Sequence, residues 1–141
     1  METIKLTYPV DGGDLIGAGE ASSKMKLTLK RLGLPQDIRR RASICMYEGE
    51  INMVIHADGG TAEVEVGMDE IMIKMTDTGP GIPDVEQAMK EGFSTAGPTA
   101  RELGFGAGMG LPNMKRYADE FSLETEEGKG TVVTMKLKLS V

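Results

Sequence analysis

The chain has 141 residues, of which 40% are hydrophobic and 27% are charged, a composition typical of one soluble globular domain spanning residues 1–141. Its net charge of −6 argues against nucleic acid and anionic lipid as general partners. One cysteine, Cys45, and one histidine, His56, exclude an internal disulfide and argue against a Cys/His zinc site. Without a signal-like start or a membrane-length apolar run, a cytoplasmic location is expected.

Alternating apolar and polar residues at 3–8 predict a first strand, which Pro9 should end. From Asp14 onward, apolar residues recur at steps of three and four, which is typical of a helix with one buried face. Gly33 and Pro35 should end this helix. Its expected inward positions are Leu15, Ala18, Ser22, Met25, Leu29 and Leu32.

A second helix is predicted from about Pro35 to about Ala57, followed by an antiparallel hairpin with strands at 61–66 and 70–76. The inward positions of the helix are Ile38, Ala42, Cys45, Met46 and Met53, with His56 as a further candidate. In the hairpin, the inward positions are Ala62, Val64, Val66, Ile71, Ile73 and Met75.

The rest of the chain is predicted to contain one substantial helix and two strands. A Gly/Pro turn at 77–83, a short helix at 84–91 and an irregular glycine-rich stretch at 92–110 come first. The helix that follows should carry Leu111, Met114, Ala118 and Phe121 on one face, and the last strands lie near 122–126 and 131–139. This order predicts a two-layer α/β sandwich of the α+β type, with a mostly antiparallel sheet covered by helices on one face.

The first candidate for chemistry is the pair Glu48 and Asn52. Four residues apart on a helix, their side chains project from the same face, about 5–6 Å apart at Cβ. A carboxylate can orient a hydroxyl or accept its proton, and an amide oxygen is a suitable neutral ligand for Mg²⁺. A bare Glu-x-x-x-Asn is more often a solvated polar face, and Glu50 lacks this spacing to Asn52.

The second candidate is Asp77-Thr-Gly-Pro-Gly81, at the end of a predicted strand. A carboxylate there can accept a hydrogen bond from an exocyclic amino group such as that of adenine. Gly79 and Gly81 allow the backbone to approach a ligand closely. The same residues also favour an ordinary turn at a strand end, so alone this motif decides little.

The third candidate is the glycine run at Gly104, Gly106, Gly108 and Gly110, which leads into a predicted helix. Alternating glycines do not serve core packing, but their amides can surround an anion at the start of a helix. A mobile loop without a ligand is the alternative. The dinucleotide-binding spacing Gly-x-Gly-x-x-Gly fails here, and Gly-Lys-Gly at 128–130 is not a Walker-type loop.

The fourth candidate is Gly128-Lys-Gly-Thr131, a tight turn between the last strands. The Thr131 hydroxyl can reach a base edge, although an ordinary hairpin turn explains the turn equally well. His56, one turn beyond Asn52, is more often a structural residue than a functional one. Arg39, Arg40 and Arg41 are interpreted as a solvated helix start or part of a partner surface.

Taken in order, these four motifs resemble those of the GHKL family, which gyrase, Hsp90, histidine kinases and MutL share and which has the Bergerat ATP-binding fold. Glu48-Gly-Glu-Ile-Asn52 is similar to its N box, and the segments beginning at Asp77, Gly104 and Gly128 are similar to its three glycine boxes. Within the family, the chain resembles bacterial anti-sigma factors and switch-protein serine kinases. Glu91-Gly-Phe-Ser-Thr95 is similar to the stress-module kinase subgroup, and Asn52-Met-Val-Ile-His-Ala57 to the anti-sigma subgroup.

The resemblance implies a role for each motif in binding ATP and Mg²⁺. Asn52 would hold the metal and the phosphates, and Asp77 would bind the adenine amino group with Gly81 and Thr131 nearby. Residues 92–110 would form a lid over the triphosphate. Glu48 would be the catalytic residue, orienting a serine or threonine hydroxyl or a water. The nucleotide-binding set is completed by Gly79, Gly104, Gly106, Gly108, Gly110 and Leu111.

The resemblance implies a serine/threonine protein kinase that phosphorylates a STAS-domain anti-anti-sigma partner. The alternative is an ATP-gated anti-sigma module that sequesters a sigma factor or another regulator, and anti-sigma relatives often form homodimers. A free-standing histidine-kinase-like ATPase ranks last, because the chain has no phospho-accepting histidine helix. Two features depart from the family pattern: Gly49 inside a helix and the extended lid at 96–103, where Arg101 is a candidate γ-phosphate contact.

Overall fold

The structure is a computed structural model, in which eight helices and strands lie within the described residues (3–12, 17–56, 59–77, 79, 110–126 and 128–139). Three are helices: α1 (Glu20–Arg31), α2 (Gln36–His56) and α5 (Gly110–Tyr117). Five are strands: β1 (Ile4–Asp11), β2 (Gly59–Val66), β3 (Glu70–Asp77), β4 (Glu120–Glu126) and β5 (Gly130–Lys138).

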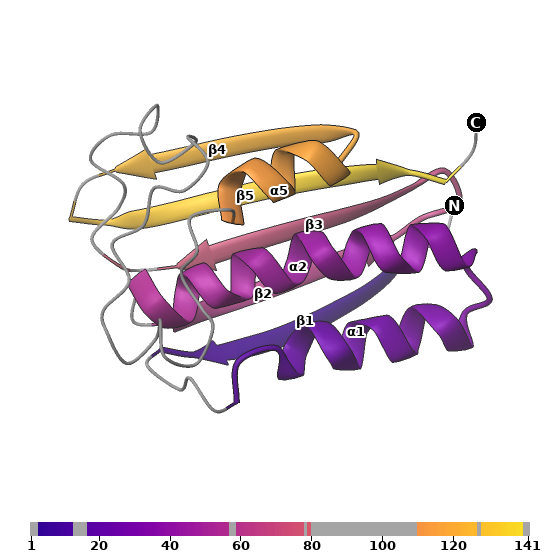
Figure 1. Ribbon diagram of the computed structural model, residues 1–141, viewed down its shortest axis with the longest axis horizontal. Coiled ribbons are helices and arrows are strands. Elements are labelled where there is room, and N and C mark those ends of the chain that lie inside the picture. Colours follow the sequence, from indigo (N-terminus) through magenta and orange to yellow (C-terminus); the bar gives the residue numbers. More distant parts are fainter. Residues whose placement is uncertain are drawn as a thin grey trace.

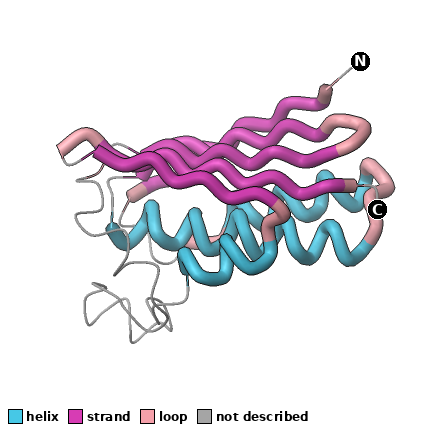
Figure 2. The backbone as a smooth tube through the Cα atoms, turned by 90° about the horizontal axis from the view of Figure 1, so that it is seen from above, coloured by secondary structure: helices cyan, strands magenta, loops and turns pink. Residues whose placement is uncertain are grey.

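The five strands form one sheet in the order β1-β2-β3-β5-β4, and every neighbouring pair is antiparallel. The helices lie side by side on one face of this sheet, with α2 between α1 and α5 (Figure 1). Seen from above, the helices and the sheet form two separate layers (Figure 2). The predicted two-layer sandwich is therefore confirmed.

The core lies between the two layers and contains most of the inward positions that periodicity predicts, while the predicted position Leu15 lies outside the described residues. Buried residues of α2 meet alternate residues of β2, β3 and β5, and Met25 and Leu29 of α1 are fully buried beside them. On the opposite face of the sheet the strands carry polar residues, including the ion pair between Lys5 and Glu65 at 3.8 Å. One apolar face and one polar face are what an antiparallel sheet covered on one side requires.

The first helix begins later than the predicted start near Asp14, because α1 starts at Glu20 after Gly19, whose φ is 97°. Ala118 was predicted on the face of the last helix but follows its end, since α5 ends at Tyr117.

Three further details differ from the prediction, each for a physical reason. Pro9 does not end β1, because β1 is an edge strand and a residue without an N–H is tolerated there. Leu32 follows the end of α1 and is 40% exposed, so it is not an inward position. Phe121 belongs to β4 rather than to the preceding helix, and it lies opposite Met135 of β5. The predicted helix at 84–91 lies outside the described residues.

Gly49 explains an apparent weakness of the sequence, a glycine in the middle of α2. A Cβ at this position would collide with the Sδ of Met75, a residue of β3 that is 2% exposed. The missing side chain therefore lets α2 lie close to β3. Glycine destabilises a helix by about 1 kcal/mol relative to alanine. The close packing of α2 on β3 offsets this loss.

We predict that Gly49→Ala destabilises the protein although alanine favours a helix. Overpacking a core costs about 1–3 kcal/mol, which outweighs the gain in helix propensity and leaves a net loss of about 1 kcal/mol. Urea unfolding followed by circular dichroism measures the difference. The control is Gly67→Ala, where a Cβ makes only ordinary contact with the Glu70 carbonyl and should change stability by less than about 0.5 kcal/mol. A Gly49→Ala protein more stable than the wild type would contradict this packing.

Candidate functional site

The second half of α2 approaches the end of β3, where the acidic residue of the second motif lies. Gly49 packs on Met75, and one turn later Met53 reaches Gly60 of β2, which is paired with Asp77. Any side chain at Gly60 would collide with the Thr76 carbonyl and approach the Asp77 Cα to 2.9 Å. These contacts fix the distance between α2 and the Asp77 end of the sheet.

Asp77 and Thr131, far apart in sequence, meet because β3 and β5 are neighbours. The Oδ1 of Asp77 accepts hydrogen bonds from the amides of Gly79, at 3.0 Å, and Thr131, at 3.1 Å. Among the described residues no hydrogen bond reaches the other oxygen, Oδ2. The Thr131 hydroxyl lies 3.0 Å from that of Thr125. Asp77 is therefore held by one oxygen, which leaves the second as an acceptor.

Glu48 lines a pocket of about 320 Å³ between α1 and α2. Ala18, Gly19 and Ser22 form one wall of this pocket, and Ser43, Tyr47 and Glu48 are among the residues of the other. Burial raises the pKa of Glu48, and a hydrogen bond from the Asn113 side chain of α5 opposes this shift. Glu48 therefore combines access to a pocket with a carboxylate that holds a proton more tightly than an exposed one.

Asn52 lies one turn beyond Glu48 on α2 and is half-buried. No hydrogen bond of its side chain is found within the described part of the chain. The described residues contain no cluster of three or more acidic, histidine or cysteine side chains that could hold a metal alone. One amide ligand suits Mg²⁺, which keeps several waters and takes other ligands from nucleotide phosphates.

Glu50, two residues after Glu48, has a different environment. It is 3% exposed, and its Oε2 accepts hydrogen bonds from the amides of Gly19, at 2.9 Å, and Ala21, at 3.1 Å. Its Oε1 accepts the amide of Ser22, at 3.0 Å, and the Ser22 hydroxyl, at 2.6 Å. Glu50 therefore joins α2 to the first turn of α1 and does not face the pocket of Glu48.

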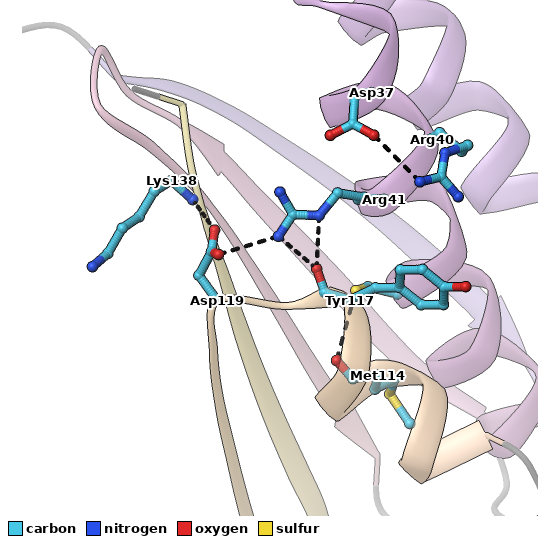
Figure 3. A network of polar contacts seen from close by, with 8 residues as sticks. Asp37, Arg40, Arg41, Met114, Tyr117, Asp119 and Lys138 are labelled. Carbon is cyan, nitrogen blue, oxygen red and sulfur yellow. Dashed lines mark hydrogen bonds and ion pairs between the residues drawn. The ribbon is translucent and has the colours of Figure 1, made fainter. Parts of the chain in front are cut away.

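Arg41 joins α2 to the end of α5 (Figure 3). Its guanidinium donates to the Tyr117 carbonyl through Nε, at 3.1 Å, and Nη2, at 2.9 Å, and Nη2 also lies 3.2 Å from Asp119. Asp119 in turn accepts the Lys138 amide at 2.7 Å, and this bond is the main cause of its lowered pKa. Arg41 therefore satisfies a carbonyl that the helix end leaves free.

The other arginines of the triplet also have local partners. Arg39 donates to the Leu34 carbonyl at 3.1 Å. Arg40 lies 3.3 Å from Asp37, with its guanidinium 5.7 Å from the centre of the Tyr117 ring. Arg40 is exposed, as expected for a solvated helix start, whereas Arg39 and Arg41 are partly buried and bond to the preceding turn and to the end of α5. A role for the triplet in a partner surface stays a prediction.

The predicted site residues have different outcomes. Glu48 and Asn52 share α2, and Asp77, Gly79 and Thr131 are brought together. The pocket at Glu48 includes neither Asn52 nor Asp77. Gly81, Gly104, Gly106 and Gly108, the candidate Arg101 and most of the lid at 92–110 lie outside the described residues. Gly110 begins α5, while the side chains of Leu111 and His56 are not described.

Three functional neighbours were missed from the sequence: Glu50, Asn113 and Arg41. All three act across helix–helix contacts, which periodicity along one helix does not reveal. The role of Glu50 becomes clear only once the structure places the N-cap of α1 at Gly19, which has no side chain to cap the helix. Cys45 is no candidate nucleophile, since burial raises the pKa of its thiol to about 12 and the Sγ faces the Met114 carbonyl at 3.9 Å.

A one-sided antiparallel sandwich with an acid–amide pair on its central helix defines a class of nucleotide-binding domain. A family model described as histidine kinase-, DNA gyrase B- and HSP90-like ATPase matches residues 40–141, and the chain belongs to this family. Membership of an ATPase family implies that the chain binds ATP. No helix within the described residues has both the length and the apolar character to cross a membrane.

Curated relatives include both kinases and anti-sigma factors. Serine/threonine-protein kinase RsbT of Bacillus subtilis (strain 168) is 36% identical over 108 residues, which are 74% of this chain and 75% of that protein. An anti-sigma F factor of Pasteuria penetrans is 36% identical over 99 residues, covering 65% of this chain and 63% of that protein. One from Thermoanaerobacter sp. (strain X514) is 35% identical over 89 residues, covering 63% and 54%. The chain is thus similar to both anti-sigma regulators and a protein kinase.

We predict that Arg41→Ala lowers the free energy of unfolding by about 1–3 kcal/mol, because it leaves the Tyr117 carbonyl without its donors. Arg40→Ala is the matched control: it removes one exposed ion pair and a ring contact and should cost less than about 1 kcal/mol. Urea unfolding of both variants measures the difference. An equal loss of stability in the two variants would contradict a stabilising role for the bonds between Arg41 and the end of α5.

We predict that Glu48→Gln stabilises the protein without nucleotide, and more so at pH 7 than at pH 4. The folded-state pKa of Glu48 lies above its unfolded value of about 4.3. Its favourable contribution is therefore complete below that value and is lost as the pH rises through the folded pKa. Urea unfolding across this range measures the effect, with the exposed Glu124→Gln as control. A difference between Glu48→Gln and wild type that does not grow with pH would contradict the raised pKa.

Proposed function

We propose that the chain is a serine/threonine protein kinase that binds ATP with Mg²⁺ and phosphorylates a STAS-domain partner of the anti-anti-sigma type. The single observation that carries the proposal is the geometry of Asp77, whose Oδ1 is held by two amides while Oδ2 remains an acceptor. A carboxylate with one free oxygen suits the amino group of adenine. Its place at the end of β3, beside Thr131, allows the hydroxyl of Thr131 to contact the same base.

Glu48 and Asn52 supply the groups needed at the other end of the nucleotide. The Asn52 amide oxygen would hold Mg²⁺, which when bound neutralises charge on the phosphates. The Glu48 carboxylate orients the attacking hydroxyl and accepts its proton. Because burial raises its pKa, it is a better base for this task than an exposed glutamate.

The transfer conserves atoms and charge. The hydroxyl oxygen of the partner's serine or threonine forms a bond to the γ-phosphorus, and the bond from that phosphorus to the bridging β,γ-oxygen breaks. The electron pair of the broken bond stays on ADP, and the hydroxyl proton passes to Glu48. The residues of this chain therefore act by positioning and by accepting one proton, as expected for phosphoryl transfer. The phosphate added to the partner changes its docking by adding negative charge.

A second candidate function is an ATP-gated anti-sigma module, which binds a sigma factor and performs little catalysis. The similarity to anti-sigma F factors supports it as directly as the similarity to RsbT supports the kinase. Both functions use the same nucleotide contacts. They differ in the role of Glu48: the kinase needs it for phosphate transfer, whereas the anti-sigma module does not need it.

We predict that Asp77→Asn weakens ATP binding, whereas Glu48→Gln preserves binding and abolishes transfer. The side-chain amide that replaces the Asp77 carboxylate would present a donor where the base needs an acceptor, and loss of a catalytic base costs about 10²–10⁴-fold in rate. Binding is measured with a fluorescent ATP analogue, and transfer with radiolabelled ATP and a purified STAS domain. Asp69→Asn, in the exposed turn between β2 and β3, should leave both unchanged.

The outcomes separate the candidates. Nucleotide binding without transfer to the STAS domain, together with ATP-dependent capture of a sigma factor, would favour the anti-sigma module. Full binding by the Asp77→Asn variant would contradict the proposed adenine contact itself.

A further inference from the structure

The first turn of α1 depends on a side chain from another helix. The first amides of a helix have no partners within it, and a capping side chain usually binds them. Here the capping position is Gly19, which has a left-handed φ of 97° and no side chain to offer. Glu50 of α2 replaces the missing cap with four hydrogen bonds to Gly19, Ala21 and Ser22.

The bonds of Glu50 are of a strong kind. Its acceptor is a carboxylate, its donors include three backbone amides, and the site lies at the positive end of the helix dipole. The side chain is 3% exposed, so water competes little for these bonds. The start of α1 is therefore held in a fixed position relative to α2.

The segment that Glu50 holds is one wall of the pocket that Glu48 lines. Gly19 and Ser22, which donate to Glu50, face Tyr47 and Glu48 across this pocket. The wall stands close, since a Cβ on Gly19 would lie 3.0 Å from the Cε1 of Tyr47. Glu48 thus faces the pocket, while Glu50, two residues later on α2, holds the opposite wall in place.

We propose that Glu50 is a positioning residue for phosphoryl transfer: by fixing the start of α1, it keeps the pocket in the shape that holds the partner's hydroxyl-bearing segment against Glu48. This inference rests on the kinase function proposed above. It assigns Glu50 no proton transfer and no contact with the nucleotide. Loss of Glu50 therefore affects use of the protein substrate more than use of ATP.

The test is Glu50→Gln, which keeps the shape of the side chain but removes its charge and places an NH₂ donor against amide donors. Steady-state transfer to a purified STAS domain gives kcat and the KM for each substrate. We expect the KM for the STAS domain to rise about tenfold, while affinity for a fluorescent ATP analogue changes less than about threefold. Hydrogen exchange should become faster at the amides of residues 19–22.

A milder variant covers the case in which Glu50→Gln does not fold. Ser22→Ala removes one of the four hydrogen bonds and keeps the amide bonds, so it should shift the same KM in the same direction by a smaller factor. A purely structural role would reduce the folded fraction, which lowers kcat and leaves both KM values unchanged. That result, in either folded variant, would overturn the inference.

The labelling rate of an introduced thiol tests the role of Glu50 without requiring phosphate transfer, so it separates this inference from the proposed function. If the wild type transfers no phosphate, the kinase proposal fails, and the pocket is tested through Ser43→Cys, whose new thiol lies in its other wall. Cys45 is buried and does not compete for reagent. We expect Glu50→Gln, or Ser22→Ala, to change the thiol's labelling rate several-fold. An unchanged rate would show that Glu50 does not shape the pocket.

Discussion

The close packing of α2 on the end of β3 is the contact on which the site depends. Gly49 removes the side chain that would keep the helix away from Met75, and one turn later Met53 reaches Gly60 beside Asp77. Residues at i and i+4 share a helix face, so the face with Gly49 and Met53 is buried while the adjacent face carries Glu48 and Asn52. A glycine that weakens α2 as an isolated helix thereby sets the depth of the site.

Environment, and not residue type, separates the two glutamates of this helix. Glu48 has a pocket on one side and, within the part of the chain that the structure describes, one side-chain donor, Asn113. It is therefore suited to the chemistry proposed for it. Glu50 is surrounded by donors from α1 and is fully occupied. A buried carboxylate with satisfied bonds holds structure together, whereas a partly desolvated one with a raised pKa is suited to accept a proton.

The periodic parts of the fold could be predicted because burial repeats along each element. Alternation in β2, β3 and β5 and the inward positions of α2 follow directly from one apolar layer between sheet and helices. Phe121 was misassigned because an inward apolar residue fits the end of a helix and the start of a strand equally well. Pro9 was misjudged because its tolerance depends on strand order, which a linear sequence does not contain.

In the candidate site, too, features that follow from local sequence could be predicted, whereas features that depend on helix placement could not. The motif spacing predicts Glu48, Asn52, Asp77 and Thr131 as site residues, and the structure joins Asp77 to Thr131 across two neighbouring strands. The meeting of Asp77 and Thr131 depends only on strand pairing. The roles of Glu50, Asn113 and Arg41 depend on where three helices lie relative to one another, and no local pattern records this.

The three helices act on Glu48 as one unit. The wall of α1 is held by Glu50, and α5 is held at its end by Arg41 and contributes Asn113 near its start. Burial between these helices raises the pKa of Glu48, while the Asn113 bond favours the charged carboxylate and works against that rise. Burial is the larger of the two effects. In the proposed kinase function, the strength of Glu48 as a base would therefore be set by helix placement, and residues that never touch the reacting atoms would tune it.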